Sequence, residues 1–506
     1  MVIPPERRTE YMVLLATVIA SGMSFITSTS IGVLLPSMQR ELDLDGVQMI
    51  WVANAYTLFL SSLILVGGAL GDRLGRKRVF MFGISLFALA SVACGLAAGG
   101  FQLIVARGIQ GIGAALMVPT SLAVLSASFP PDRRGRAIGL WSTFTSASIA
   151  LGPALGGVLA GAGLWRLVFF INLLLSAVAL AAAAQIPPME PVDREGRIDW
   201  LGALLVTLGL ALLTLGFSQG PGRGWGDPLV AGTLIGGVAA LVAFVLWQNR
   251  VSHPLIPLEL FRSATFSGGN LLTFFLYIAL QSVFFFLPIN LIQVQGYPES
   301  LAGLTILPFI ILLTVLSPWA GTLVDKIGPR LPLIVGPFLA GCGMILLGMA
   351  GLTGGPADYW LRFFPGVTLV GVGMGLTVAP LTTAVMKAAP DERAGAASGI
   401  NNAVANTAGV LAVAILGALA LSVFAGLLGA AAAELPLSEA ARVALQVEAG
   451  KLAGAAVPPI IGTELAGRVQ SAIDLAFADT FRVVMWVAGG LAWFGALISA
   501  WLIRND

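Results

Sequence analysis

Charged residues are scarce in this sequence. Only 10% of its 506 residues are Asp, Glu, Lys or Arg, whereas a soluble domain carries about 25%. The surface of the folded chain must therefore face something other than water. A soluble enzyme, a nuclease or a nucleic-acid-binding protein is excluded, and the net charge of +2 points to no particular partner.

Residues that bind metals or form disulfides are equally rare. Cys94 and Cys342 both lie in apolar runs, which predicts small core residues rather than a disulfide framework. His253 is the single histidine and cannot form a metal cluster alone. No convergent set of Ser, His and Asp and no phosphate-binding loop is recognisable. We therefore expect no enzyme activity, no metal and no cofactor.

Apolar segments of about 20 residues recur along the whole chain instead, and each is long enough to cross a bilayer as a helix. We predict an all-α polytopic membrane protein with fourteen spans. Their approximate ranges are 12–35, 49–70, 79–98, 101–127, 137–160, 166–185, 200–217, 229–247, 268–292, 302–324, 331–352, 362–386, 395–424 and 481–503.

The distribution of basic residues predicts the orientation. With an even number of spans, both termini lie on one side, and most of the 27 Lys and Arg fall on the loops of that side. The positive-inside rule then places both termini in the cytoplasm.

One loop on the opposite side is long. Residues 425–480 include Leu465, Val469, Ile473 and Phe477, which repeat every four residues on one helical face. This spacing predicts an amphipathic helical hairpin lying on the outer surface, with Thr463 as a helix cap. A solvated linker is the alternative interpretation.

Two loops repeat each other. Residues 68–79 read GALGDRLGRKRV and residues 321–332 read GTLVDKIGPRLP, with Asp72 and Asp325 in corresponding positions. We expect two matched six-helix bundles with two extra spans between them. The expected division is 1–185 for the first bundle, 186–262 for a linker with the extra spans, and 263–506 for the second bundle with the hairpin.

Four motifs in order resemble the major facilitator superfamily, and the fourteen-span plan resembles its fourteen-helix drug:proton antiporter family. They are GALGDRLGRKRVF (68–80), LIVARGIQGIGAA (103–115), LGPALGGVLAG (151–161) and WRLVFFIN (165–172). The resemblance implies an exporter in a bacterial-type plasma membrane. It also implies that Asp72, Arg73, Arg76, Arg107 and Asp325 take part in coupling or in a latch that closes the cytoplasmic side.

Two motifs also have a physical interpretation of their own. Gly152, Gly156 and Gly157 allow another helix to approach closely, and Pro153 can bend the helix, so this segment is a candidate hinge. Ordinary tight packing is the alternative. Arg107 is costly within a span, and it either snorkels to the membrane surface or lines a polar cavity.

Candidate cavity residues are polar or aromatic positions within the spans. Asn270, Phe274, Tyr277, Gln281 and Phe285 form one helical stripe, for which helix packing is the alternative interpretation. We add Thr27 in the first span. Arg107 and Gln110 in the fourth span are also candidates, with Asn54 beside Tyr56 in the expected neighbouring span. In the thirteenth span we add Asn402, which lies between Asn401 and Asn406.

The sequence departs from the family in the first span. Thr27 stands where family members commonly carry an acid, and no Asp or Glu lies well inside any span. Proton coupling would then depend on carboxylates at the membrane edge, which are Asp72, Asp325 and Asp358. A stripe of aromatic rings and amides suits a large, weakly polar ligand, and without a buried acid a neutral or anionic one is favoured.

We therefore predict a secondary transporter that exports lipophilic or amphiphilic molecules by alternating access, with protons as the coupling ion. The partners would be that substrate and the lipid bilayer, with no nucleic acid, and the protein would be a monomer. A lipid or amphiphile carrier without conventional proton coupling is the first alternative. A transporter-like sensor that moves nothing is the second.

Overall fold

A computed structural model of the chain describes residues 5–189, 191, 198–390 and 394–504, and within these ranges every regular element is a helix. The long helices are α1 (Pro5–Leu42), α2 (Gly46–Leu74), α3 (Arg76–Leu96), α4 (Gly100–Ser128), α5 (Pro131–Gly161), α6 (Leu167–Ala184), α7 (Trp200–Arg223), α8 (Pro228–Gln248), α9 (Ala264–Ile289), α11 (Leu307–Ile327), α12 (Arg330–Gly348), α14 (Phe364–Lys387), α15 (Ala394–Glu434) and α17 (Thr463–Leu502). Shorter helices are η1 (Leu258–Arg262), η2 (Asn290–Val294), α10 (Glu299–Leu304), η3 (Pro356–Asp358), α13 (Tyr359–Arg362), α16 (Glu439–Ala449) and η5 (Leu452–Gly454).

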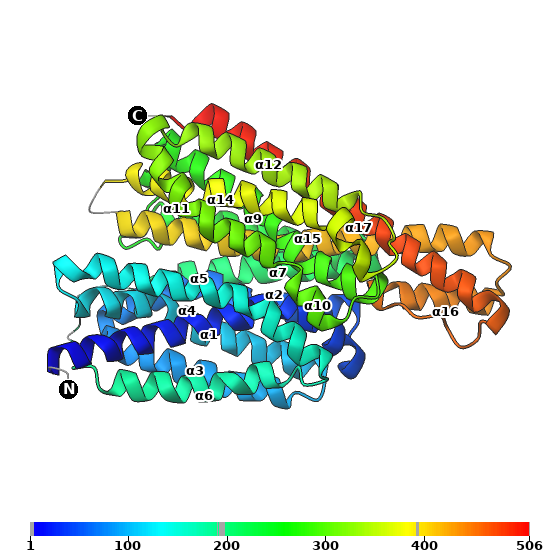
Figure 1. Cartoon of the computed structure of the whole chain (residues 1–506), viewed down its shortest axis with the longest axis horizontal. Coiled ribbons are helices and arrows are strands. Elements are labelled where there is room, and N and C mark those ends of the chain that lie inside the picture. The colour runs from blue at the N-terminus through cyan, green and yellow to red at the C-terminus, as the bar shows by residue number, and fades with distance from the viewer. Residues whose placement is uncertain (1–4, 190, 192–197, 391–393, 505–506) are drawn as a thin grey trace.

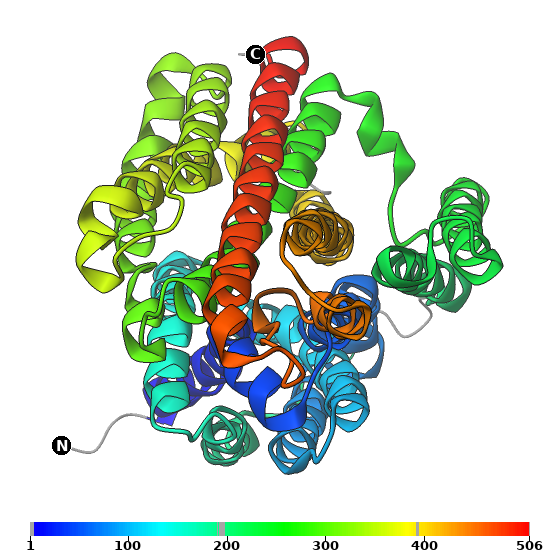
Figure 2. The same ribbon diagram turned by 90° about the vertical axis from the view of Figure 1, so that its right-hand side faces the viewer.

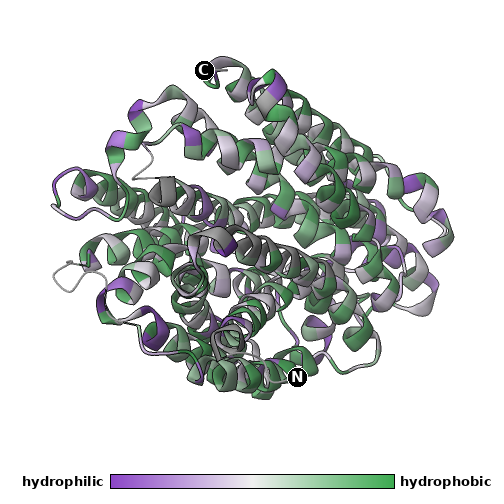
Figure 3. Ribbon diagram, turned by 60° about the vertical axis from the view of Figure 1, so that its left-hand side comes forward, coloured by the Kyte–Doolittle hydropathy of each residue, from purple (hydrophilic) through white to green (hydrophobic). Residues whose placement is uncertain are grey.

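The predicted helical membrane fold is confirmed. Thirteen helices of the described part are long and apolar enough to span a membrane, and the fourteenth predicted span falls on α5. Colouring by hydropathy shows apolar residues along the flanks of the helices, with hydrophilic residues more frequent towards their ends (Figure 3). This distribution is expected where the flanks face lipid and the ends face water.

The helices form two bundles that lie side by side (Figure 1). Helices α1 to α6 make the first bundle, and α9 to α17 make the second. The chain termini lie at one end of the molecule, which we call the terminal end. The opposite end carries a projection built from α15, α16 and α17, and we call it the hairpin end.

Helices α7 and α8 pack on each other and stand beside the bundles (Figure 2), where α7 contacts α2 and α15. Asp199 joins the pair at the N-terminus of α7. Its buried carboxylate accepts hydrogen bonds from Trp247 Nε1 at 2.7 Å, Gln248 Nε2 at 2.5 Å and the Gly202 amide at 2.8 Å. These bonds cap α7 and tie it to the end of α8.

The repeated loops both turn at a glycine with a positive φ angle. Gly75 ends α2 with a φ of 100°, and Gly328 ends α11 with a φ of 75°. Only glycine adopts such angles without strain. The chain therefore turns sharply into α3 and into α12 at the terminal end, and the internal repeat is visible in the backbone.

The segment 425–480 differs from the prediction. Its helices continue α15 and α17 beyond the bundles instead of lying on their surface (Figure 1). The four-residue stripe is present, because Val469, Ile473 and Phe477 are buried and Phe477 packs edge-on against Phe424 of α15. Thr463 is the first residue of α17 rather than its cap, which is Gly462.

Candidate functional site

Arg107 lies on α4, seven residues from its start at the hairpin end. Its side chain is 1% exposed. Nε donates to the backbone oxygen of Val52 at 3.3 Å, and Nη1 donates to Oε1 of Gln110 at 2.7 Å. The guanidinium also lies 4.6 Å from the ring centroid of Tyr56. Arg107 therefore does not snorkel to the membrane surface, since all its described contacts lie inside the first bundle.

A chain of hydrogen bonds continues from this arginine through the bundle. Gln110 donates to Ser91 Oγ at 2.7 Å, and Asn172 donates to the same oxygen at 3.3 Å. Asn172 also donates to Thr27 Oγ1 at 2.9 Å. These four side chains are buried, so α1, α3, α4 and α6 are joined by one polar network.

This network contains no carboxylate. Thr27, where an acid would be expected from the family resemblance, is 0% exposed and donates to the Met23 carbonyl at 2.7 Å. The positive charge of Arg107 is therefore balanced by dipoles and a π face rather than by an anion. In this conformation Arg107, Gln110 and Thr27 cannot touch a ligand, because they are buried within one bundle.

Asn54 connects the two bundles. Its Nδ2 donates to the Val410 carbonyl of α15 at 3.0 Å. Phe274 of α9 packs against the cluster that contains Val410 and Leu58, together with residues of α7. The structure thus brings two predicted cavity residues, Asn54 and Phe274, to the same junction of α2, α9 and α15.

The predicted stripe on α9 divides into three environments. Asn270 is buried and bonds to Asn401, whose Nδ2 also reaches Thr273 Oγ1 at 2.7 Å. Phe285 is buried against Phe286. The middle residues, Phe274, Tyr277 and Gln281, are half-buried.

Gln281 lies at the interface between the bundles. A β-carbon built on Gly409 would be 3.9 Å from both Gln281 Cγ of α9 and Thr57 Cγ2 of α2. On α15, Asn406 is half-buried and Asn402 is exposed. Tyr277, Gln281, Asn402 and Asn406 are therefore the predicted polar residues with side-chain surface left for a ligand.

The glycines of α5 pack on two neighbours. Gly152 and Gly156 contact Thr29 and Ser30 of α1 within the first bundle. On the other face, a β-carbon at Gly157 would collide with the Glu299 carbonyl of α10, and one at Gly303 of α10 would collide with the Pro153 carbonyl. This seam places two backbones from different bundles in direct contact.

The predicted latch residues are not all described. Asp72 Oδ1 accepts from Arg76 Nε at 2.8 Å across the Gly75 turn, and Arg73 is exposed. Asp72 is thus paired within its own bundle here. Asp325 belongs to α11, but its side chain lies outside the described part.

Sequence reasoning missed the polar contacts between the bundles at the hairpin end. Glu299 of α10 pairs with Arg40 of α1. Gln39 accepts from Gln293 Nε2 at 2.9 Å and donates to the Lys451 carbonyl at 3.1 Å. Such residues carry no periodic signal, because loops and helix ends bring them together from segments far apart in the chain.

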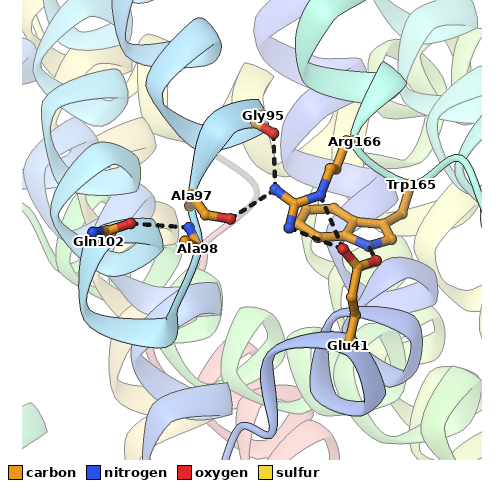
Figure 4. A network of polar contacts seen from close by, with 7 residues as sticks. All are labelled: Glu41, Gly95, Ala97, Ala98, Gln102, Trp165 and Arg166. Atoms are coloured by element: carbon orange, nitrogen blue, oxygen red, sulfur yellow. Dashed lines mark hydrogen bonds and ion pairs between the residues drawn. The ribbon is translucent and has the colours of Figure 1, made fainter.

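Sequence reasoning also missed a second cluster of polar contacts, which forms around Trp165 and Arg166 just after α5 (Figure 4). Glu41 at the end of α1 accepts from Trp165 Nε1 and from Arg166 Nη2, the latter at 2.9 Å. Arg166 Nη1 also donates to the carbonyls of Gly95 and Ala97. The first bundle is thereby tied together along its rim at the hairpin end.

Comparison with known proteins agrees with this architecture. The profile of the Major Facilitator Superfamily matches residues 17–413. The chain belongs to this superfamily of membrane transporters.

The chain is similar to the multidrug resistance protein Stp of Mycobacterium tuberculosis, with 35% identity over 81% of this chain and 76% of that protein. It is 31% identical to the tetracenomycin C resistance and export protein of Streptomyces glaucescens, over 96% of this chain and 90% of that protein. A crystal structure of a bacterial homologue of the human lysosomal transporter Spinster shares the fold, with a TM-score of 0.66, 21% identity and 98% coverage of both chains.

Proposed function

We propose that this protein exports lipophilic or amphiphilic small molecules across a bacterial-type plasma membrane by alternating access. The names of its relatives, which describe resistance to and export of antibiotics, support export. The excess of Lys and Arg on the loops of the terminal end supports a cytoplasmic position for that end. The protein works as a monomer in this proposal, since each chain contains both bundles.

The distribution of contacts between the bundles supports an inward-open state. Among the described residues, the polar contacts of Asn54, Gln39 and Arg40 with the second bundle all lie toward the hairpin end. The backbone seam between α5 and α10 lies there as well. The bundles are thus fastened on the extracytoplasmic side, and substrate enters from the cytoplasm or the inner leaflet.

The observation that carries the substrate class is the Arg107 network. A buried guanidinium without a carboxylate partner raises the local positive potential, which disfavours a cationic ligand nearby. The accessible surface of Tyr277, Gln281, Asn402 and Asn406 offers one ring and three amides, with no negative charge. Neutral or anionic lipophilic compounds therefore fit this site better than lipophilic cations.

Proton coupling in this proposal uses groups outside the membrane-spanning middle of α1, where Thr27 stands in place of an acid. We propose that Asp72 and Asp325 at the terminal end change partners between the two states, as the resemblance implies. Arg107 transmits charge to the substrate region through the bundle. Asp358 lies outside the spans at the hairpin end, where its carboxylate accepts a hydrogen bond from the Gly354 amide at 2.7 Å.

 That carboxylate therefore serves a loop in the described structure, and the coupling proposal does not depend on it.

The test is transport by the purified protein in liposomes with an imposed pH gradient. Lumen pH and substrate uptake are followed together for size-matched neutral, anionic and cationic lipophilic compounds. We expect neutral and anionic compounds to move and to dissipate the gradient, with cations moving at least tenfold more slowly. The Arg107→Gln variant should reduce the difference in transport rate between cations and the other compounds, because it removes the charge that repels cations.

Two outcomes would contradict parts of this proposal. Preferential transport of cations would exclude the substrate class. Substrate movement without any proton flux would exclude proton coupling and leave a facilitated carrier. Empty liposomes and a Gly232→Ala variant, whose added methyl group meets open space on α8, are the controls.

An amphiphile carrier on the same fold is the second candidate. A pocket of about 550 Å³ lies between α15 and α17 in the projection, and it is lined by apolar residues such as Leu427 and Leu475 together with Glu434, Arg468 and Asp479. Such a mixed lining suits an amphiphile. Transport of a labelled phospholipid between liposomes without proton flux would favour this candidate.

A further inference from the structure

The projection at the hairpin end returns to the opposite bundle. After α16, residues 450–456 form a short segment, which we call the strap, and it includes η5. The strap belongs to the second bundle by sequence, because it lies between α15 and α17. In Figure 2 this orange segment lies next to the blue corner between α1 and α2 of the first bundle.

Backbone contacts fasten the strap to that corner. The Gly46 amide, at the first residue of α2, donates to the Gly450 carbonyl at 2.8 Å. A β-carbon at Gly46 would be 2.6 Å from the same oxygen. The corner and the strap therefore meet at a distance that a larger residue at position 46 would prevent.

Gln39 at the end of α1 joins three segments. Its Nε2 donates to the carbonyls of Leu44 and Lys451, both at 3.1 Å, and its Oε1 accepts from Gln293 of η2 at 2.9 Å. Its amide also fills the space beside Gly454, where a β-carbon would be 2.5 Å away. The side chain is 5% exposed.

Two more features hold the strap in place. Lys451 Nζ lies 3.6 Å from Asp43 in the corner and 3.2 Å from Glu448 on α16. The hydrogen bond with Glu448, together with the charges of Glu448 and Asp43, raises the pKa of Lys451 above its ordinary value. Leu452 is buried with a φ of 54°, a strained conformation for leucine that persists only where the surroundings enforce it.

We propose that the strap is a separate component of the extracytoplasmic gate, that Gln39 is its positioning residue, and that the strap must leave the α1–α2 corner each time the transporter opens outward. The proposal rests on the proposed alternating-access function. It follows because the strap and the corner belong to bundles that must move apart at this end.

Two buried polar groups near the closed gate lack hydrogen-bond partners, as expected where a contact must break. Gln293 donates to Gln39, but Oε1 of Gln293 is buried without a hydrogen-bond partner, and so is the Tyr297 hydroxyl nearby in the chain. Both groups would regain hydrogen bonds with water on opening. This gain offsets part of the loss of the strap contacts.

The first test is a reversible cross-link. Asp43→Cys and Lys451→Cys are combined in a protein whose Cys94 and Cys342 are replaced by alanine. A bifunctional methanethiosulfonate reagent joins the two thiols across the space that the lysine side chain filled, mass spectrometry verifies the cross-link, and the protein is assayed in liposomes. We expect transport to fall at least tenfold on cross-linking and to recover on reduction. The matched control is Glu41→Cys with Arg166→Cys, which replaces an ion pair within the first bundle on the same rim. Cross-linking that pair with the same reagent should leave transport unchanged.

The second test does not depend on transport. A Thr57→Cys probe at the interface between the bundles is labelled by a membrane-impermeant maleimide added outside. Gln39→Met keeps the side chain's length but removes its hydrogen bonds, so we expect labelling to be roughly tenfold faster. Gln39→Asn should give an intermediate rate.

The outcomes separate the two proposals. If the cross-linked Asp43→Cys/Lys451→Cys protein transports at the rate of the reduced protein, or if Gln39→Met leaves the labelling rate unchanged, the strap is not part of the gate, although export stands. If neither the parent protein nor any variant transports a compound while Gln39→Met still accelerates labelling, export of these compounds is contradicted, whereas the role of the strap in opening the extracytoplasmic side stands.

Discussion

Arg107 and Gln110, one helical turn apart on α4, form a 2.7 Å hydrogen bond between buried side chains inside a membrane bundle. Gln110 in turn donates to Ser91, so the guanidinium is held by a network of neutral groups. A buried charge with no opposite charge beside it destabilises a membrane protein. Its presence here indicates a role in function rather than in stability.

The first prediction concerns this cost. Arg107→Met replaces the buried charge by an apolar chain of similar length. We expect an unchanged or higher melting temperature in detergent, because the cost of burying a charge in a span offsets the hydrogen bonds that are lost. Export should nevertheless fall at least tenfold. A large loss of stability with export lost in proportion would show that Arg107 is structural.

The second prediction concerns the seam between α5 and α10. Gly157→Leu places a side chain against the Glu299 carbonyl, where even a β-carbon collides. The bundles then cannot close at the hairpin end, so the Thr57→Cys probe should be labelled faster from outside and export should be lost. Gly232→Ala is the control with free space around it. Normal export by Gly157→Leu would contradict the close packing.

The third prediction distinguishes two roles for Asp72. In this conformation it only pairs with Arg76, a partly exposed contact worth less than about 1 kcal/mol. If that pair were its whole role, Asp72→Asn and Arg76→Gln would have equally small effects on export. We expect Asp72→Asn to reduce export at least tenfold more than Arg76→Gln, because Asp72 takes a different partner in the outward-open state. Equal effects of the two variants on export would exclude a latch role for Asp72.

The fourth prediction concerns the junction of α7 and α8. Asp199→Ala leaves the Trp247 and Gln248 donors without their acceptor and removes the α7 cap, at a cost of about 2–4 kcal/mol. Asp227→Ala removes only the more exposed cap of α8, at about 1 kcal/mol. Thermal unfolding should therefore rank the parent protein first, Asp227→Ala second and Asp199→Ala last. If Asp227→Ala unfolded at a lower temperature than Asp199→Ala, the role of Asp199 in joining α7 to α8 would be contradicted.

Much of the fold could be predicted from the sequence, because membrane spans depend on local composition. Apolar runs indicated every long helix, and the repeated loops with Asp72 and Asp325 indicated two related bundles. The glycine pattern around Pro153 indicated close packing on α5, which the structure confirms at Gly157. These features are encoded within short windows of the chain.

Other features were decided by tertiary structure alone. The hairpin was expected to lie on the surface, yet it extends α15 and α17, because the apolar stripe of Val469, Ile473 and Phe477 is buried within the projection rather than on the bundles. The pairing of Gln39 with residues 293 and 451 could not be read from sequence, since no periodic pattern links positions so far apart. The sequence by itself determined which segments enter the membrane, whereas tertiary packing decided which polar groups meet, because that depends on how the two bundles face each other.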